Sequence, residues 1–311
     1  MLVSDLTPRA LRQQLHGSGL RLRTGPVVTR VRSRLDSVAD GISLHYANHA
    51  AEDGAGFADF NVSVERPQGF RRWIAPQVVF NVDEASSFAP LPGDQGFPML
   101  EWGLNWCISS HCHQFLIVHA AVLERGGKAV LLPAPSGSGK STLCAALAFS
   151  GWRLLSDELA LLDPQHGHVV PLPRPISLKN ESIEVIRAFA PRAALGPVVR
   201  ETLKGSVAHA RPPEESVSRD TESALPAWVI VPRFSPGGEA RMESMPKARA
   251  FMGLVASAFN YNVHGREGFR ALTRLVDAAD CYQFSYGRLE DAIPLFDRLG
   301  RVSKHNERRA C

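Results

Sequence analysis

The chain has 311 residues, of which 44% are hydrophobic and 21% charged, and its formal net charge is +4. This length suffices for one large domain or two smaller ones with a sizeable core. The mild charge gives no indication of nucleic-acid binding. No apolar run approaches the roughly 20 residues that a membrane span needs. The start of the sequence lacks a signal-peptide pattern and the five cysteines form no evident disulfide framework, so a cytoplasmic protein is predicted.

The first 98 residues are predicted to form a β-rich N-terminal region. Strands are indicated by alternating apolar residues over 20–34, 57–66 and 73–82, with glycine, proline and aspartate between them. Residues 1–34 also carry seven arginines against one aspartate. These arginines favour a solvated surface, with a docking face for an acidic partner as the alternative.

Residues 99–311 are predicted to form a second domain. Helical spacing over 99–114 is followed by two apolar runs, 115–123 and 129–132, which indicate a β-hairpin. Further along, a strand is predicted over 227–234 and helices over 247–260, 266–279 and 291–299. The polar segment 200–224 is expected to be an irregular loop or lid.

The segment after the hairpin has the pattern of a phosphate-binding loop. Its residues are Ala134, Pro135, Ser136, Gly137, Ser138, Gly139, Lys140, Ser141 and Thr142. The two glycines let backbone N–H groups converge on phosphate oxygens, Lys140 adds a positive charge, and the Ser141 hydroxyl can bind Mg²⁺. Ala134 stands where the first glycine usually occurs, which is tolerable if its φ is negative. A nucleotide site is therefore predicted; the alternative is a glycine- and serine-rich turn.

An acidic pair, Asp157-Glu158, lies within a strand predicted over 152–162. Phosphoryl transfer needs a metal ligand and a base for the acceptor hydroxyl, and two carboxylates can supply them. Neighbouring side chains in a regular strand point to opposite faces. The two carboxylates can therefore face the phosphates together only at a strand end or a bulge. His119, ahead of the loop, is by itself more typical of a buried core histidine.

Other candidate groups lie further from the loop. In the predicted lid, Lys204, His209 and Arg211 either close over the phosphates or belong to a solvated loop. Asn260, Tyr261 and Asn262, near Arg266, are candidates for the acceptor side. The crowded set Cys107, His111, Cys112 and His113 lacks the paired spacing of a zinc module, so core packing is favoured for Cys107.

From His119 to Leu162 the sequence resembles the HPr kinase/phosphorylase family, and in particular the HPr-kinase-related kinases of the group called HprK-related kinase A. The resemblance rests on His119-Ala120-Ala121-Val122-Leu123-Glu124, the loop, and Ser150-Gly151-Trp152-Arg153-Leu154-Leu155-Ser156-Asp157-Glu158. It implies an α/β fold with a P-loop kinase core of the HPr kinase/PEP carboxykinase-like type. It also implies catalytic roles for His119, Lys140, Asp157 and Glu158, with Glu158 as the base where the family has Asp. Ser141, Asp157 and Glu181 are the implied metal ligands, although Glu181 matches the family pattern poorly.

The leading hypothesis is an ATP- and Mg²⁺-dependent kinase acting on a serine of a small protein or peptide, with reversal by phosphate as a further implication of the resemblance. Two alternatives stay open. One is a small-molecule kinase or carboxykinase-like enzyme on the same core, and the other is a nucleotide-gated scaffold without catalysis. The sequence does not identify the acceptor, and it leaves homo-oligomerisation open.

Overall fold

The computed structural model describes residues 1–67, 76–83, 85–86, 88–135 and 137–307. Over these residues the chain is a mixed α/β protein with three sheets, and it forms two compact units. The first unit comprises Met1–Ile108, Arg174–Ile183 and Ala194–Ser218, and the second comprises Ser109–Pro173, Glu184–Ala193 and Arg219–Cys311. The predicted domain boundary lay after residue 98. The first unit extends past it to Ile108 and also includes Arg174–Ile183 and Ala194–Ser218.

The larger sheet of the first unit has the strand order β3-β1-β2-β4-β5-β6, with β7 paired to β5. In it β2 and β4 run parallel and the other pairs antiparallel. The strands are β1 (Leu20–Thr24), β2 (Val27–Ser33), β3 (Ala51–Asp53), β4 (Phe60–Glu65), β5 (Gln77–Val82), β6 (Ala85–Ser86) and β7 (Leu91–Pro92). The strands predicted over 20–34 and 57–66 are confirmed, the first as two strands. Of the strand predicted over 73–82, residues 77–82 are confirmed and 73–75 lie outside the described residues.

Helical elements accompany this sheet, and of those described here only the last was predicted. The helical elements are η1 (Val3–Asp5), α1 (Pro8–His16), α2 (Asp36–His45), η2 (Gly93–Gln95) and α4 (Gly96–His111). Helix α1 has a readable signal: the Thr7 hydroxyl accepts the Ala10 N–H at 3.2 Å, Pro8 occupies the first position, and Leu11 and Leu15 are buried one turn apart. The helix predicted over 99–114 is confirmed as α4. The N-terminal region is therefore α/β rather than only β-rich.

The segment expected to be an irregular lid, 200–224, is largely regular structure. A three-stranded sheet in the order β13-β15-β14 takes up its first part. The elements here are β13 (Ile176–Lys179), α6 (Glu181–Phe189), β14 (Val199–Thr202), β15 (Gly205–Ala210) and α7 (Glu214–Ser218). The expectation is wrong because β15 pairs antiparallel with β13, about 30 residues away in sequence. Two strands that are this far apart in the sequence form a non-local contact, and a polar sequence gives no local pattern that predicts it.

The three basic lid candidates make contacts inside the first unit. His209 is 3% exposed and packs against His45 and Phe97. The Arg211 guanidinium donates to the Leu44 carbonyl at 2.5 Å, and the Lys204 ammonium lies 5.0 Å from the centre of the Trp102 ring. The buried His209 is therefore a core residue and not a phosphate ligand.

His45 and His209 are buried together as neutral side chains. His45 stacks on the Phe97 ring, with 5.0 Å between ring centres, and it lies 6.0 Å from His209. Burial, together with a smaller effect of nearby positive charges, lowers the pKa of His45 to about 4 and that of His209 to about 3. Protonation of either ring opposes folding.

We expect the first unit to lose stability as the pH falls below about 6.5, the ordinary pKa of an unfolded histidine. Because both pKa values are depressed in the folded chain, the unfolded chain binds more protons between pH 6.5 and 4. At pH 5 each histidine then removes about 2 kcal/mol of unfolding free energy. Chemical denaturation at pH 7.5 and pH 5 measures this loss. The variant His209→Leu, which cannot be charged, should show about half of it; an equal loss in both proteins contradicts the assignment.

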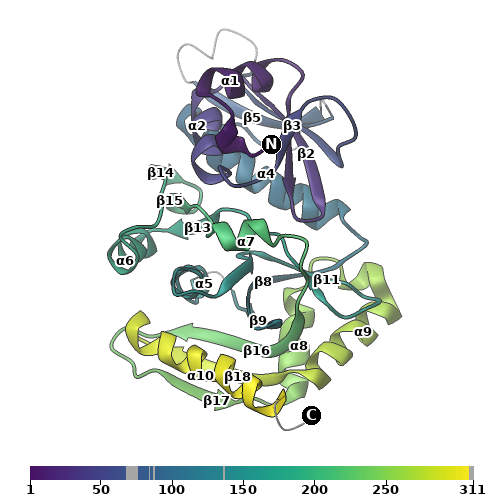
Figure 1. Cartoon of the computed structure of the whole chain (residues 1–311), viewed down its shortest axis with the longest axis vertical. Helices are drawn as coiled ribbons and strands as arrows, with labels where there is room; N and C mark the ends of the chain where they lie inside the picture. The colour runs from purple at the N-terminus through teal and green to yellow at the C-terminus, as the bar shows by residue number, and fades with distance from the viewer. Residues whose placement is uncertain (68–75, 84, 87, 136, 308–311) are drawn as a thin grey trace. The chain divides into compact units, whose positions relative to one another are not determined.

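The second unit is built on an eight-stranded sheet with the order β12-β11-β8-β9-β16-β18-β17, and β10 also pairs with β8 (Figure 1). The strands are β8 (Leu116–Arg125), β9 (Lys128–Pro133), β10 (Arg153–Ser156), β11 (Leu159–Leu162), β12 (Val169–Val170), β16 (Leu225–Phe234), β17 (Arg241–Ser244) and β18 (Asp280–Tyr286). β9, β16 and β18 run parallel, whereas β8 and β17 run antiparallel to their neighbours. The hairpin predicted over 115–132 and the strand predicted over 227–234 are confirmed.

Four helices complete the second unit: α5 (Lys140–Phe149), α8 (Lys247–Ser257), α9 (Tyr261–Ala278) and α10 (Leu289–Glu307). The helices predicted over 266–279 and 291–299 are confirmed as the longer α9 and α10. The helix predicted over 247–260 is confirmed as α8, which ends earlier, at Ser257. The side chains of Leu254, Leu272 and Leu275 on α8 and α9 pack with Val118, Val122 and other alternate residues of the sheet in one buried cluster. This burial of an apolar helix face on an apolar sheet face stabilises the unit.

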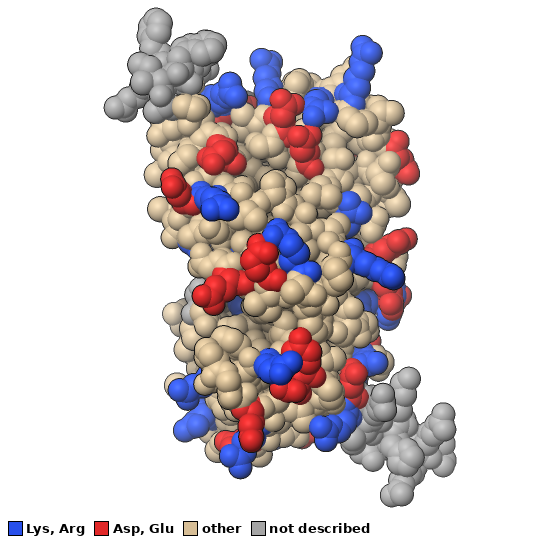
Figure 2. All heavy atoms as spheres, turned by 90° about the vertical axis from the view of Figure 1, so that its left-hand side faces the viewer, with Lys and Arg blue, Asp and Glu red and all other residues tan. Residues whose placement is uncertain are grey.

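Within the described ranges, no helix is long and apolar enough to cross a membrane. Figure 2 shows lysine and arginine interspersed with aspartate and glutamate over the face in view, without a large area of one sign.

Candidate active site

The predicted phosphate-binding loop connects β9 to α5 in the second unit. Gly137 and Gly139 have φ values of 86° and 87°, a left-handed conformation that favours glycine. Ala134 is buried and is not among the described residues with positive φ, so alanine fits there without strain. Ser136 lies outside the described residues. Helix α5 begins at Lys140 without a side-chain cap on its first turn, which leaves backbone N–H groups available to an anion.

Two aromatic residues that the sequence analysis missed hold this loop in place. The Tyr286 hydroxyl donates to the Gly139 carbonyl at 2.9 Å, and the Phe234 N–H donates to the Ser138 carbonyl at 3.0 Å. A Cβ atom on Gly139 would lie 2.4 Å from the Tyr286 hydroxyl oxygen. Two features therefore require glycine at position 139: its positive φ and the close approach of the Tyr286 hydroxyl.

Lys140 and His119 meet at the start of α5. The Lys140 Nζ lies 2.8 Å from His119 Nε2, and the lysine is only 6% exposed. An ammonium group donates but cannot accept, so this bond requires an unprotonated Nε2 on His119. His119 lies on β8 directly before Ala120, which pairs with Pro133 at the end of β9. The hairpin thus places the histidine beside the loop.

The acidic pair interrupts the strand that was predicted over 152–162. β10 ends at Ser156 and β11 begins at Leu159, whose N–H donates to the Ser156 hydroxyl at 3.0 Å. Asp157 and Glu158 occupy the break between them, directly before Leu159, which pairs with His119. The prediction of one continuous strand is wrong at this point, and the break meets the condition under which both carboxylates can serve one site.

Asp157 and Glu158 differ in environment. Asp157 is 5% exposed and accepts a hydrogen bond from the Cys144 thiol, one turn after Lys140 on α5. Burial raises the pKa of Cys144 well above its usual value, and the Asp157 carboxylate raises it further. Glu158 is half-buried. Asp157 is thus held against the helix that carries Lys140, whereas Glu158 is more accessible.

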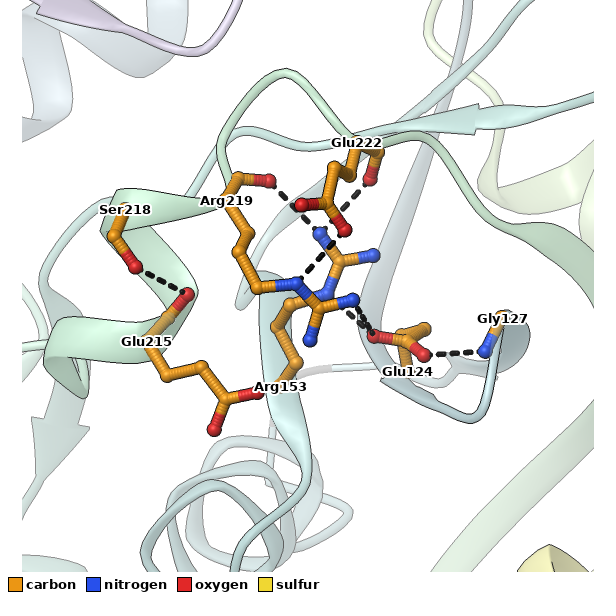
Figure 3. A network of polar contacts seen from close by, with 7 residues as sticks. All are labelled: Glu124, Gly127, Arg153, Glu215, Ser218, Arg219 and Glu222. Atoms are coloured by element: carbon orange, nitrogen blue, oxygen red, sulfur yellow. Dashed lines mark hydrogen bonds and ion pairs between the residues drawn. The ribbon is translucent and has the colours of Figure 1, made fainter.

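A buried ion-pair network anchors β10, the strand that leads to Asp157 (Figure 3). The Arg153 guanidinium donates to the Glu124 carboxylate of β8, and both side chains are almost fully buried. Arg153 also donates to the carbonyls of Arg219 and Glu222 at 2.9 and 2.8 Å. Arg219 contributes a second positive charge, 3.7 Å from Glu124.

We expect Glu124→Gln to lower the free energy of unfolding by about 3–5 kcal/mol, because it leaves a buried guanidinium without its carboxylate. Glu222→Gln is the matched control: its side chain is 55% exposed and pairs with Arg219 at 2.8 Å, so its loss should cost about 1 kcal/mol at most. Urea denaturation of both variants measures the difference. Equal losses would show that the Glu124 pair contributes no more than a surface pair.

Other predicted residues have different places. Asn260 is 2% exposed, and its amide bridges β8 through the Ile117 N–H at 2.9 Å and the Phe115 carbonyl at 2.8 Å. It therefore anchors the segment between α8 and α9 rather than facing an acceptor. Glu181 begins α6 and belongs to the first unit, so its role as a metal ligand stays a prediction.

Among the described residues, no three His, Cys, Asp or Glu side chains are grouped closely enough to hold a metal ion. Ser141, in the first turn of α5, and Asp157 remain as candidate ligands within the second unit. Mg²⁺ is commonly held by one or two protein oxygens together with substrate phosphates and water. The Ser141 hydroxyl and the Asp157 carboxylate are oxygen donors of this kind.

Comparisons with known proteins give a partial match over this part of the chain. A family model described as "SynChlorMet cassette protein ScmC" matches residues 100–182, which include the loop and the acidic pair. No curated protein shows a significant match. A solved structure, the Hpr(Ser) kinase/phosphatase from Coxiella burnetii, is similar to 62% of this chain and 98% of its own, with 14% identity and a TM-score of 0.28.

Proposed function

We propose that the chain is an ATP- and Mg²⁺-dependent kinase that phosphorylates a serine hydroxyl on a peptide or small protein. The second unit is then a P-loop kinase core of the HPr kinase/PEP carboxykinase-like type. The observation that carries the proposal is the 2.8 Å contact between Lys140 and His119 at the loop, with Asp157 on the adjacent strand break. A phosphate-binding loop alone serves motors, switches and kinases alike. A histidine and a carboxylate beside it are groups that a phosphotransferase needs.

The loop suits the triphosphate of a nucleotide. Nothing lies within 4 Å of the position that a Cβ of Gly137 would take, so the backbone there is open to a ligand. The uncapped N-terminus of α5 and the buried Lys140 both favour negative charge. Ser141 and Asp157 would hold Mg²⁺, which when bound neutralises charge on the phosphates.

The different environments of the two carboxylates support a division of roles. Asp157 is buried against α5, which suits the metal side of the site, whereas the half-buried Glu158 is open to an acceptor hydroxyl. Glu158 accepts the serine proton as the serine oxygen forms its bond to the γ-phosphorus and the bond to the leaving ADP oxygen breaks. Lys140 stabilises the charge on the transferred group, and His119 holds the lysine in position.

The nature of the acceptor rests on sequence resemblance. Residues 119–162 resemble HPr kinase and the related kinases that are associated with peptide-modifying pathways. This resemblance favours a serine on a protein or peptide as the phosphate acceptor. The matched family model is described as a cassette protein, so the products of neighbouring genes are the first acceptors to test.

The test is incubation of the purified chain with γ-labelled ATP, Mg²⁺ and each neighbouring gene product, followed by mapping of the labelled residue. We expect label on a serine of one of them. Label on a small metabolite without any protein acceptor would favour a small-molecule kinase. Tight ATP binding with no loss of the γ-phosphate in any mixture would contradict catalysis.

A further inference from the structure

The end of the sheet at which the loop lies also carries an exposed aromatic ring. β9, β16 and β18 run parallel, so their carboxyl ends lie at one edge of the sheet. β9 ends in the phosphate-binding loop, β16 ends at Phe234, and β18 ends at Tyr286, which is the register partner of Phe234. Ligands of open α/β sheets bind at the carboxyl ends of such strands.

The groups proposed for chemistry lie on one side of the loop, and Phe234 lies on the other. In the strand order β11-β8-β9-β16-β18, His119 on β8 and the acidic pair before β11 precede β9, whereas β16 follows it. If the γ-phosphate is directed toward His119, the nucleoside end of the same molecule extends toward β16. Phe234, the last residue of β16, lies on that side.

Phe234 is exposed and yet firmly held. It is 45% exposed, although phenylalanine is usually buried. Its N–H is bound to the Ser138 carbonyl, and its ring packs edge-on against Tyr286 with 5.5 Å between ring centres. Tyr286 is itself 1% exposed and stacks on Phe284 at 5.4 Å. Phe234 is thus the open member of an otherwise buried aromatic series.

Tyr286 links this series to the loop. Burial raises the pKa of its hydroxyl, which therefore keeps its proton and donates to the Gly139 carbonyl. The segment after Phe234 is fixed as well, because the Ser235 N–H donates to the Tyr286 carbonyl at 2.9 Å. The ring is therefore held at a fixed position relative to Ser138 and Gly139.

We propose that Phe234 is the stacking platform for the base of the nucleoside triphosphate, an inference that rests on the proposed nucleotide site. A base stacked on an aromatic ring gains affinity without hydrogen-bond readout, so the platform accepts adenine and guanine alike. In alanine-substitution series such stacking accounts for about a 5- to 100-fold change in affinity. The triphosphate contributes separately, through the loop.

The experiment compares ATP with inorganic tripolyphosphate, which lacks the base, by titration calorimetry. We expect Phe234→Ala to weaken ATP binding by about 5- to 100-fold and to leave tripolyphosphate binding unchanged. Phe234→Trp should retain or improve ATP affinity. Leu225→Ala is the matched control, because Leu225 is 56% exposed at the opposite end of the same strand and should affect neither ligand.

The outcomes separate this inference from the proposed function. Equal ATP affinity in the wild type and Phe234→Ala, with tripolyphosphate still bound, overturns the platform and leaves the loop assignment intact. A parallel loss of ATP and tripolyphosphate affinity in Phe234→Ala also overturns it, because the residue would then support the loop only. Failure of the wild-type chain to bind either ligand overturns the nucleotide site and the platform together.

Discussion

Replacing Lys140 by methionine should lower the rate of phosphoryl transfer by about 10³-fold or more. The lysine is 6% exposed at the first position of α5, and its ammonium lies at the mouth of the loop beside His119. Its charge is therefore only weakly screened by water, and its loss removes stabilisation of the phosphoryl group as it transfers. Methionine keeps the length and apolar stem of the side chain, so the fold should persist. Single-turnover assays with labelled ATP and the identified acceptor measure the rate.

A matched lysine lies at the other end of the strand that leads into the loop. Lys128 begins β9, and Lys128→Met removes one positive charge from the same unit without touching the loop. We expect its transfer rate to match that of the wild type, which would exclude a general effect of net charge. Undiminished transfer in Lys140→Met would contradict the whole assignment of the loop.

The parts of the second unit with local signals were predictable from the sequence. The hairpin β8–β9 and helix α5 follow from apolar runs separated by glycines, and these signals need no knowledge of distant partners. The break between β10 and β11 was not predicted, because Leu154-Leu155 and Leu159-Ala160 together look like one apolar strand. The register shift beside Ser156 interrupts it.

Features that depend on distant pairing were not predictable in the same way. β15 is a strand because it lies against β13, and His209 is buried because β15 carries it against Phe97. Likewise, Phe234 and Tyr286 reach the loop only because β16 and β18 lie next to β9 in the sheet. Spacing in the sequence can identify those residues of a site that lie close together along the chain. Residues contributed by parallel neighbours become visible only with the strand order.

Substitutions of Asp157 and Glu158 should have different effects on catalysis. We expect Glu158→Gln to lower kcat by about 10²- to 10⁴-fold, as the loss of a general base does, with an unchanged requirement for Mg²⁺. Asp157→Asn should instead raise the Mg²⁺ concentration needed for half-maximal rate, because its carboxylate lies buried against α5. Measuring kcat over a range of Mg²⁺ concentrations for both variants distinguishes these roles.

Asp163→Asn supplies the control, since Asp163 directly follows β11 and carries a carboxylate at the end of that strand away from the break. Its rate and Mg²⁺ dependence should equal those of the wild type. A shifted Mg²⁺ requirement only in Glu158→Gln would reverse the two roles. Glu158 would then be the metal ligand and the buried Asp157 the general base. Wild-type behaviour in both acidic variants would contradict the proposed chemistry at the strand break, since both carboxylates proposed for it would then be dispensable.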